Sequence, residues 1–423
     1  QNDNPSTVDD IWHAATNTRG EYINARTPRD ITDAMRRILA SVGGGETPSG
    51  SLALTGARVG EGSFSVEPLY ASANSGTDWY STPTAYGLTT NNLTGQVYQS
   101  VMWEAASKIP AAGSRAIFVG KTSGNVKPTV TAFSTTNVAL ADLCSDTLSR
   151  CTAAGTARNS INSLGINHAE AIAYLRGDQS LENSTSKPLR RRTTRLGDIV
   201  NSSPLIVSPL NDYGYRSLGG ADPYDYAAYL ATKKASRKPM VFVGANDGML
   251  HAFHGESGVE QFAYVPVASL GHMGNLLFPY RAEDKDDQVF THRYYVDGPI
   301  NVSDAYYSGS WKTVLVGALG AGGRGVFGLD VSSATSFAAS GVLWDINDRS
   351  SDVNIKNNIG HVLAKPVIVP VKVGTSVSWK AIFGNGYNSI NNRAVLFIVD
   401  IATGAVTTVQ AAGAGYSGPN GLG

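Results

Sequence analysis

The chain is poor in charge of either sign. Asp, Glu, Lys and Arg make up 16% of its 423 residues, against about a quarter in typical soluble domains. Lys plus Arg and Asp plus Glu are equal at 34 each, so no net field points to nucleic acid or to an acidic partner. Gly is abundant at 46 residues, and Tyr outnumbers Phe by 19 to 12. Low charge combined with many turn-forming residues is typical of an extracytoplasmic β protein.

Long apolar runs, an initiator Met and a signal peptide are also missing. No run of 18 apolar residues occurs, so the sequence predicts no helix that spans a membrane. The chain begins at Gln1 with neither an initiator Met nor a signal peptide. We therefore expect it to be part of a longer, exported precursor.

Cysteine occurs only twice, as Cys144 and Cys151 in "DLCSDTLSRC". Six residues separate the two in a polar loop, a comfortable spacing for a local disulfide. A zinc site would need four ligands, and the nearest histidine, His168, has no HxxxH or CxxC partner. We therefore favour a disulfide over free thiols, and with it an oxidising compartment.

The clearest helix lies near the N-terminus. Thr27-Pro28 and Asp30 form a helix start signal, and apolar residues then recur at helical spacing up to Leu39. A Gly-rich stretch ends this pattern. The sequence therefore predicts the α-helical tail of an α/β domain at 1–43, a linker at 44–50 and a second domain at 51–423.

The second domain contains an internal repeat. Three times a Pro-containing strand leads to an apolar strand ending in glycine (Gly244, Gly317 and Gly384), and a loop then leads to another apolar strand. We expect each glycine either to supply a positive φ or to let backbones approach closely. The spacing suits β-propeller blades with long insertions, since a single blade cannot bury both faces. The prediction is a mainly β chain with an incomplete propeller: three clear blades, one or two degenerate blades within 51–133, and a polar, partly helical insertion at 134–198 that carries the cysteines.

Two histidines in the first repeat raise the question of a metal site. In "GANDGMLHAFHGESG" the predicted hairpin turn is Asn246-Asp247-Gly248, followed by a strand with His251 and His254. Residues three apart on a strand point to opposite faces, so the two cannot share one ion.

Three other polar motifs predict structural loops rather than binding sites. "DINDRSSD" at 345–352 lacks the donor and the Gly that a calcium loop needs, so we expect an exposed turn. "GAGGRGVFG" at 320–328 precedes a strand rather than a helix and predicts a hairpin loop. "PLRRRTTR" at 188–195 predicts a solvated connector. No catalytic residue and no metal ligand is predicted in this chain.

One tripeptide stays a candidate site. Arg176, Gly177 and Asp178 match a known adhesion sequence. Recognition of that sequence requires an exposed loop tip, whereas here it ends a predicted short helix that includes Ala169, Ile172 and Leu175.

Several longer motifs occur in a specific order: "RLGDIVNSSP", "VFVGANDGMLHAF", "FAYVP", "YYVDGPINVSDAYY", "TVLVGALGAGGRGVFGLDV", "KPVIVPV" and "AIFGNGYNS". Together they resemble the C-terminal region of PilY-type (PilC-like) type IV pilus proteins and cover most of 190–423. "DDIWHAATNTRGEYINA" looks like the end of the von Willebrand factor A-type domain that precedes the propeller in many members.

The resemblance implies a modified, quinoprotein-like β-propeller that is exported through the periplasm to the pilus tip, cell surface or outer membrane. It implies work with minor pilins and the tip complex in pilus assembly, opposition to retraction, and adhesion to host cells or abiotic surfaces. It also implies a Ca²⁺ loop, expected after Gly423, so no ligand is assigned here. Arg176–Asp178 could correspond to the family's adhesion site.

The competing hypothesis is an enzyme, a quinoprotein dehydrogenase that uses pyrroloquinoline quinone and calcium. Such an enzyme needs an acidic base, metal ligands and an aromatic floor beneath the cofactor. None of these is recognisable as a motif, so we expect a protein without enzymatic activity.

Overall fold

The computed structural model describes residues 53–54, 63–91, 96–182, 187, 189–217, 225–279, 291–374, 376–411 and 421–422. The chain divides into two compact units, Gln1–Pro48 and Ser49–Gly423. The predicted von Willebrand A-like tail at 1–43 and the linker at 44–50 lie outside the described residues and stay predictions. All described elements belong to the second unit.

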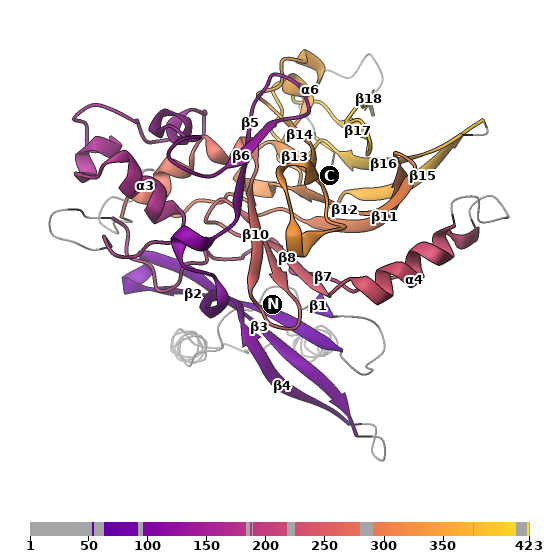
Figure 1. Cartoon of the computed structure of the whole chain (residues 1–423). Helices are drawn as coiled ribbons and strands as arrows, with labels where there is room; N and C mark the ends of the chain where they lie inside the picture. The colour runs from indigo at the N-terminus through magenta and orange to yellow at the C-terminus, as the bar shows by residue number, and fades with distance from the viewer. Residues whose placement is uncertain are drawn as a thin grey trace, which may run out of the picture. The chain divides into compact units, whose positions relative to one another are not determined.

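Strands dominate this unit and form four sheets, labelled here I to IV in chain order (Figure 1). Sheet I comprises β1 (Ala53–Leu54), β2 (Phe64–Ala73), β3 (Asp78–Thr90) and β4 (Val97–Glu104). Sheet II comprises β7 (Leu205–Val207), β8 (Met240–Gly244), β9 (Leu250–His254) and β10 (Glu260–Val265), extended by β5 (Ile117–Lys121) and β6 (Thr129–Ala132). Sheet III comprises β11 (Ile300–Tyr307), β12 (Ser310–Ala318), β13 (Gly325–Asp330) and β14 (Val342–Asn347). Sheet IV comprises β15 (Val367–Val373), β16 (Ser376–Gly384), β17 (Val395–Asp400) and β18 (Val406–Gln410).

Helices are short and lie in the connections. The α-helices are α3 (His168–Leu175), α4 (Tyr226–Ser236), α5 (Val267–Leu270) and α6 (Val353–Asn358). Single 3₁₀ turns are η1 (Asn74–Gly76), η2 (Ala105–Lys108), η3 (Ala112–Ser114), η4 (Leu140–Cys144), η5 (Ile161–Leu164), η6 (Tyr215–Ser217), η7 (Met273–Leu277), η8 (Gly320–Gly322), η9 (Ala334–Ser336) and η10 (Ala339–Gly341). In the part of the chain that the structure describes, no helix is long and apolar enough to cross a membrane.

The three predicted repeats are confirmed as strand units. They form β7–β9, β11–β13 and β15–β17, each antiparallel and each completed by a fourth strand. The hairpin loop predicted at 320–328 is also confirmed, because it joins β12 to β13. Within 51–133 the described residues hold one further four-stranded sheet, sheet I. The strands β5 and β6 do not form a second degenerate blade: β5 pairs parallel to β10 and so widens sheet II.

The hydrophobic core lies between consecutive sheets. In β8, Val241 and Val243 pack toward sheet I while Met240 and Phe242 pack toward sheet III. This alternation follows from the two-residue period of a strand. A sheet covered on both sides needs apolar residues on both faces, which explains why β8 is a continuous apolar run. Sheets III and IV enclose a third cluster, centred on Trp344, Trp379, Phe383 and Phe397.

The repeated glycines allow close approach rather than a special backbone conformation. None of Gly244, Gly317 and Gly384 has a positive φ. A Cβ on Gly244 would lie 2.2 Å from the carbonyl oxygen of Val296, and one on Gly384 would lie 2.3 Å from that of Leu422. A Cβ on Gly317 would lie 2.4 Å from the ring of Phe327. Of the two predicted roles for these glycines, the structure therefore supports the close approach of neighbouring segments.

The segments that lead into sheets III and IV each contact two neighbouring sheets. Before sheet III, the amide of Val296 donates to Ala245 O (3.4 Å) after β8, and the amide of Asp297 donates to Leu319 O (3.2 Å) after β12. Before sheet IV, His361 exchanges backbone hydrogen bonds with Tyr387, and its Nδ1 lies 2.9 Å from Gly320 O. The connecting segments thus join adjacent sheets at the ends of their second strands.

Candidate functional site: the disulfide-bearing 134–198 segment

The 134–198 segment, which connects β6 to β7, has its own small core. Its helix α3 begins at Asn167, whose side chain accepts from Glu170 N (3.0 Å) while the Glu170 carboxylate accepts from Asn167 N (2.8 Å). This reciprocal cap fixes the helix start. Ile172 and Leu175 are buried with Phe133 and residues of η7. The predicted short helix is therefore confirmed, and it anchors the segment by one apolar face.

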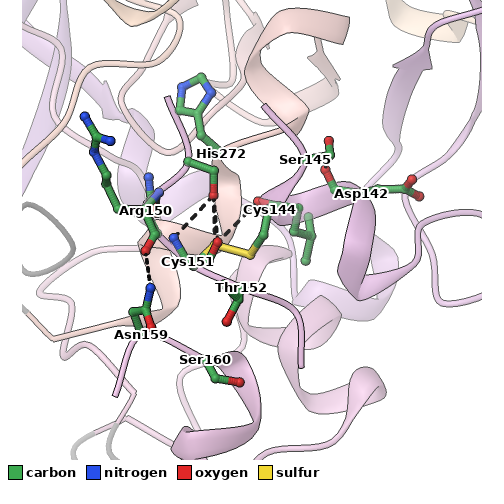
Figure 2. The surroundings of a disulfide bond; sticks show 12 residues. Asp142, Cys144, Ser145, Arg150, Cys151, Thr152, Asn159, Ser160 and His272 are labelled. Atoms are coloured by element: carbon green, nitrogen blue, oxygen red, sulfur yellow. Dashed lines mark hydrogen bonds between the residues drawn. A yellow bond between two sulfur atoms is a disulfide. The ribbon is translucent and has the colours of Figure 1, made fainter. Parts of the chain in front are cut away.

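Cys144 and Cys151 form a disulfide in the structure, with their Cα atoms 5.5 Å apart (Figure 2). The loop between them closes around Asp146, whose Oδ1 accepts from the amides of Leu148 (2.8 Å) and Ser149 (2.9 Å). Beneath the disulfide lies Gly274, where a Cβ would come within 2.5 Å of the Cys151 sulfur. The bridge thus packs directly on the backbone of η7.

The disulfide loop is bonded to segments on either side of it. The amides of Ser145 and Asp146 donate to Gly271 O at 2.8 and 3.1 Å. His272 Nδ1 lies 2.8 Å from Asp146 Oδ2, and Arg349 Nη2 lies 3.1 Å from the same oxygen. Burial opposes ionisation of Asp146, but the hydrogen bond from His272 and the charge of Arg349 lower its pKa below the usual value. A carboxylate therefore joins the loop to the residues that follow α5 and β14.

The basic stretch at 188–195 is not the solvated connector that the sequence predicts. Arg190 is buried, and its Nε donates to Leu276 O (3.4 Å). Arg192 pairs with Glu182 at 2.6 Å, donates to the carbonyls of Tyr174 (3.0 Å) and Asp178 (2.8 Å), and lies over the Tyr174 ring. The guanidinium groups satisfy carbonyls that would otherwise be buried without a partner. These arginines therefore stabilise contacts between separate segments of the chain.

The candidate adhesion tripeptide is also partly buried and hydrogen-bonded to other segments. The Arg176 guanidinium donates to three carbonyl oxygens, those of Ala112 (2.8 Å), Phe133 (2.7 Å) and Arg115 (2.7 Å). Gly177 has φ +106° and is buried, and Asp178 accepts from the amide of Ser180 at 2.8 Å. In this conformation the guanidinium is engaged with backbone rather than presented at a loop tip.

A buried charge network lies where β5 pairs with β10, and the sequence analysis did not predict it. Arg115 donates to both oxygens of Glu260, each at 2.7 Å. His251 lies between two carboxylates, with Nδ1 2.8 Å from Glu260 and Nε2 3.1 Å from Asp247. Burial opposes the charged form of His251, but the two carboxylates raise its pKa to about 9. Burial likewise opposes ionisation of Glu260, but Arg115 and His251 lower its pKa to about 2.

The two histidines of the first repeat differ in environment, as the opposite-face prediction requires. His251 is fully buried, whereas His254 is half-buried and accepts from the amide of Glu256 (3.3 Å). The turn residue Asp247 does more than reverse the chain, since its carboxylate completes the network. Strand alternation could place His251 on one face, but its acidic partners come from tertiary contacts.

Asn246 in the same turn joins three segments. Its side chain donates to Asp198 (2.7 Å) and accepts from the amide of Tyr295 (2.9 Å), and His292 Nε2 lies 2.8 Å from the same Asp198 carboxylate. The turn prediction for 246–248 is confirmed by the β8–β9 pairing. The junction role was not predicted, because none of these partners is near in sequence.

The polar stretch at 345–352 differs from the exposed turn predicted for it. Asp345 lies in β14 and is 2% exposed. Its Oδ2 accepts from the amide of Val267 (2.9 Å) and the hydroxyl of Tyr264 (3.0 Å), so it joins sheets II and III. Among the described residues, no group of three or more His, Cys, Asp or Glu side chains is arranged to hold a metal ion.

Comparison with known proteins identifies the family. The family model described as the PilY1 beta-propeller domain matches residues 196–423. A protein named type IV pilus biogenesis factor PilY1 homolog, from Xylella fastidiosa, is 36% identical over 94% of this chain and 28% of its own length. PilY1 of Pseudomonas aeruginosa strain PAK is 31% identical over 100% of this chain and 34% of its own length.

A solved structure of a relative also matches part of the chain. The crystal structure of the P. aeruginosa PilY1 C-terminal domain is 34% identical, covers 51% of this chain and 38% of that one, and gives a TM-score of 0.38. This chain spans about a third of the length of these two curated relatives. The family-model match covers more than half of the chain and confirms the resemblance inferred from the motifs. The chain belongs to the PilY1 beta-propeller domain family.

Proposed function

We propose that the chain is the propeller-containing part of a type IV pilus biogenesis factor. The observation that carries this proposal is the extent of the similarity. The relatives named type IV pilus biogenesis factor PilY1 align over 94% and 100% of the chain, so the similarity includes the 134–198 segment as well as the sheets.

The proposal has a finer part that concerns how the factor acts. It works as a tip-associated, exported protein through its surfaces: it promotes assembly with minor pilins, opposes retraction, and attaches the pilus to host cells or abiotic surfaces. Two features support this location. The disulfide suits the oxidising periplasm and cell surface, and the low charge content suits an extracytoplasmic protein.

The proposed role is non-enzymatic. The buried groups best suited to acid–base chemistry, His251 and Glu260, bind each other, and Arg115 and Asp247 occupy their remaining sides. A charge network saturated in this way stabilises the connection between strands. The names of the alignment partners, which are biogenesis factors, also support this proposal.

A genetic experiment tests the biogenesis role. In the parent organism, the gene would be replaced by a version lacking the codons for 49–423, and surface pili would be sheared and quantified. We expect few or no pili. Disabling the retraction motor in the same strain then separates the two activities: pili that return indicate a role against retraction, and pili that stay absent indicate a role in assembly. Normal piliation with an intact motor would overturn the proposal.

Adhesion through Arg176–Asp178 needs a separate test, because Arg176 is bonded to three carbonyls. Attachment of piliated cells would be measured with and without an excess of a soluble Arg-Gly-Asp peptide. We expect no competition, with attachment carried by other surfaces. Inhibition by this peptide, but not by an Arg-Gly-Glu peptide, would show that the tripeptide becomes exposed on the pilus.

The proposal also includes calcium. The family resemblance implies a calcium loop after Gly423, outside this chain, so calorimetric titration of this chain alone should show no stoichiometric Ca²⁺ binding. A longer protein that includes the following loop should bind one ion. Stoichiometric binding by this chain alone would contradict the assignment.

A further inference from the structure

A polar cavity lies between sheets II and III, beside the C-terminal end of α4. Its volume is about 330 Å³, near the lower end of the range for small-molecule sites. Five parts of the chain line it: the end of β7 with the residues after it, the end of α4 with the residues after it, β8, Thr313 of β12, and the turn after β13. The cavity is therefore formed where two adjacent sheets meet.

Three cations line this cavity, and two of them have carboxylate partners. Lys233 pairs with the buried Asp304 at 2.6 Å, and Lys238 pairs with Glu256 at 3.3 Å. Arg237 has no carboxylate within ion-pair distance among the described residues. Its Nη1 donates to the hydroxyls of Tyr229 (3.0 Å) and Thr313 (2.6 Å). The cavity consequently carries one positive charge in excess.

The position of Arg237 favours recognition of an anion. It is half-buried, and its guanidinium lies over the Tyr229 ring, 5.2 Å from the centroid. These contacts fix the guanidinium plane, which reduces the entropy lost when it binds a ligand. Its Nε and Nη2 make no hydrogen bond to any described residue, so two donors remain for a carboxylate, which guanidinium groups bind in a bidentate manner.

Hydroxyl groups of one turn also line the cavity. Ser333, Thr335 and Ser336 lie in the turn after β13, and their side chains are exposed with no hydrogen bond to other described residues. Hydroxyls can donate and accept, so this wall suits a ligand that itself carries several hydroxyl groups. Met240 and Val331 supply an apolar part of the lining, against which the C–H face of a sugar ring can pack.

We propose that this cavity binds an acidic monosaccharide, with the carboxylate on Arg237 and the sugar hydroxyls on the 333–336 turn. The unmatched cation selects for the acid, and the hydroxyl-rich wall with its apolar neighbour selects for the sugar. The inference rests on the cavity alone and does not depend on the role in pilus biogenesis.

Calorimetric titration of the purified chain tests this site with three probes. D-glucuronate is expected to bind at one site. D-glucose, which has the same ring without the carboxylate, is expected to bind at least about ten-fold more weakly, as is inorganic phosphate, which has charge without the ring. No measurable binding of glucuronate at millimolar concentration would overturn the proposal. Equal binding of glucose would overturn the role of Arg237, and equal binding of phosphate would overturn the sugar assignment.

Two variants and a matched control locate the binding. Arg237→Gln should weaken glucuronate binding by about ten-fold or more. Lys234→Gln removes the same charge from an exposed position on α4 that does not line the cavity, and it should leave the affinity unchanged. An equal loss in both variants would indicate general charge attraction and contradict the proposal.

The second variant covers the case in which Arg237→Gln disturbs the fold through Tyr229 and Thr313. Ser333→Leu places an apolar side chain at the mouth of the cavity from an exposed position, so it should preserve the thermal unfolding midpoint and abolish glucuronate binding. Full binding by a correctly folded Ser333→Leu protein would overturn the assignment.

Discussion

Arg115 donates from Nε and Nη2 to the two carboxylate oxygens of Glu260, at 2.7 Å in each case, although the two residues are 145 positions apart in the sequence. Both side chains are 1% exposed. Arg115 precedes β5 and Glu260 begins β10, so the pair stabilises the parallel pairing of these two strands. His251 and Asp247 extend the pair to the first turn of the repeated unit.

Removing the charge of Glu260 should be strongly destabilising. Glu260→Gln leaves the Arg115 guanidinium buried without its carboxylate partner. Removing one partner of a buried ion pair lowers the free energy of unfolding by about 3–5 kcal/mol. Urea unfolding followed by tryptophan fluorescence measures the loss. The control is Glu256→Gln, which breaks the exposed pair with Lys238 (58% and 53% exposed) and should cost less than about 1 kcal/mol. Similar losses in the two variants would contradict the importance of burial.

The stability of the fold should fall as the pH rises from neutral into the alkaline range. The pKa of His251 is raised from 6.5 to about 9 in the folded protein. Its charged form therefore contributes stability that is fully present below pH 6.5 and is lost as the pH passes 9. Thermal unfolding between pH 6 and 10 measures this decline. His251→Gln should lower the midpoint at pH 6.5 and flatten the decline; an unchanged slope would show that another group titrates.

The disulfide should be present in the purified, unreduced protein. Intact mass analysis should show a loss of two hydrogens relative to the reduced chain, and alkylation should modify neither Cys144 nor Cys151. The paired cysteines are seven positions apart in the sequence, so closing this short loop should contribute about 2 kcal/mol to the free energy of unfolding. Two alkylatable thiols in the native protein would refute the assignment.

A methyl group on Gly244 should separate two sheets. Its Cβ would lie 2.2 Å from the carbonyl oxygen of Val296, and this backbone is also hydrogen-bonded to Ala245. Gly244→Ala should therefore destabilise the fold by about 1–3 kcal/mol. Gly113→Ala is the control, because nothing lies within 4 Å of a Cβ there, and its effect on urea unfolding should stay near zero. A stable Gly244→Ala protein would contradict the close-approach explanation.

The repeated strand units were predictable because their signals are local. An apolar run ending in Gly, followed by a turn and another apolar run, specifies two antiparallel neighbours without reference to distant residues, as at β8 and β9. The helix α3 was predictable for the same reason, since its cap and apolar face lie within a few positions of one another. The cysteine pair belongs to this class as well.

Contacts between distant segments were not predictable. The arginines at 190 and 192 look like a solvated stretch because their carbonyl partners lie elsewhere in the sequence. The polar residues around Asp345 predict a turn. In the structure, however, Asp345 lies in a strand, and its carboxylate accepts a hydrogen bond from the amide of Val267. In both cases a polar side chain is buried because a partner compensates it, and composition alone does not reveal that partner.

The parallel pairing of β5 with β10 has a consequence for the order of folding. Sheets III and IV pair strands that are consecutive in the sequence, so each can form from a continuous piece of chain. By contrast, Ile117 aligns with Ala263, and the closure entropy of the long intervening loop slows this contact. Because the chain is synthesised from its N-terminus, β5 and β6 emerge from the ribosome well before the strand they complete. The edge of β5 therefore stays unpaired until β10 has been synthesised. During this interval the unpaired edge can aggregate with other chains or bind a chaperone.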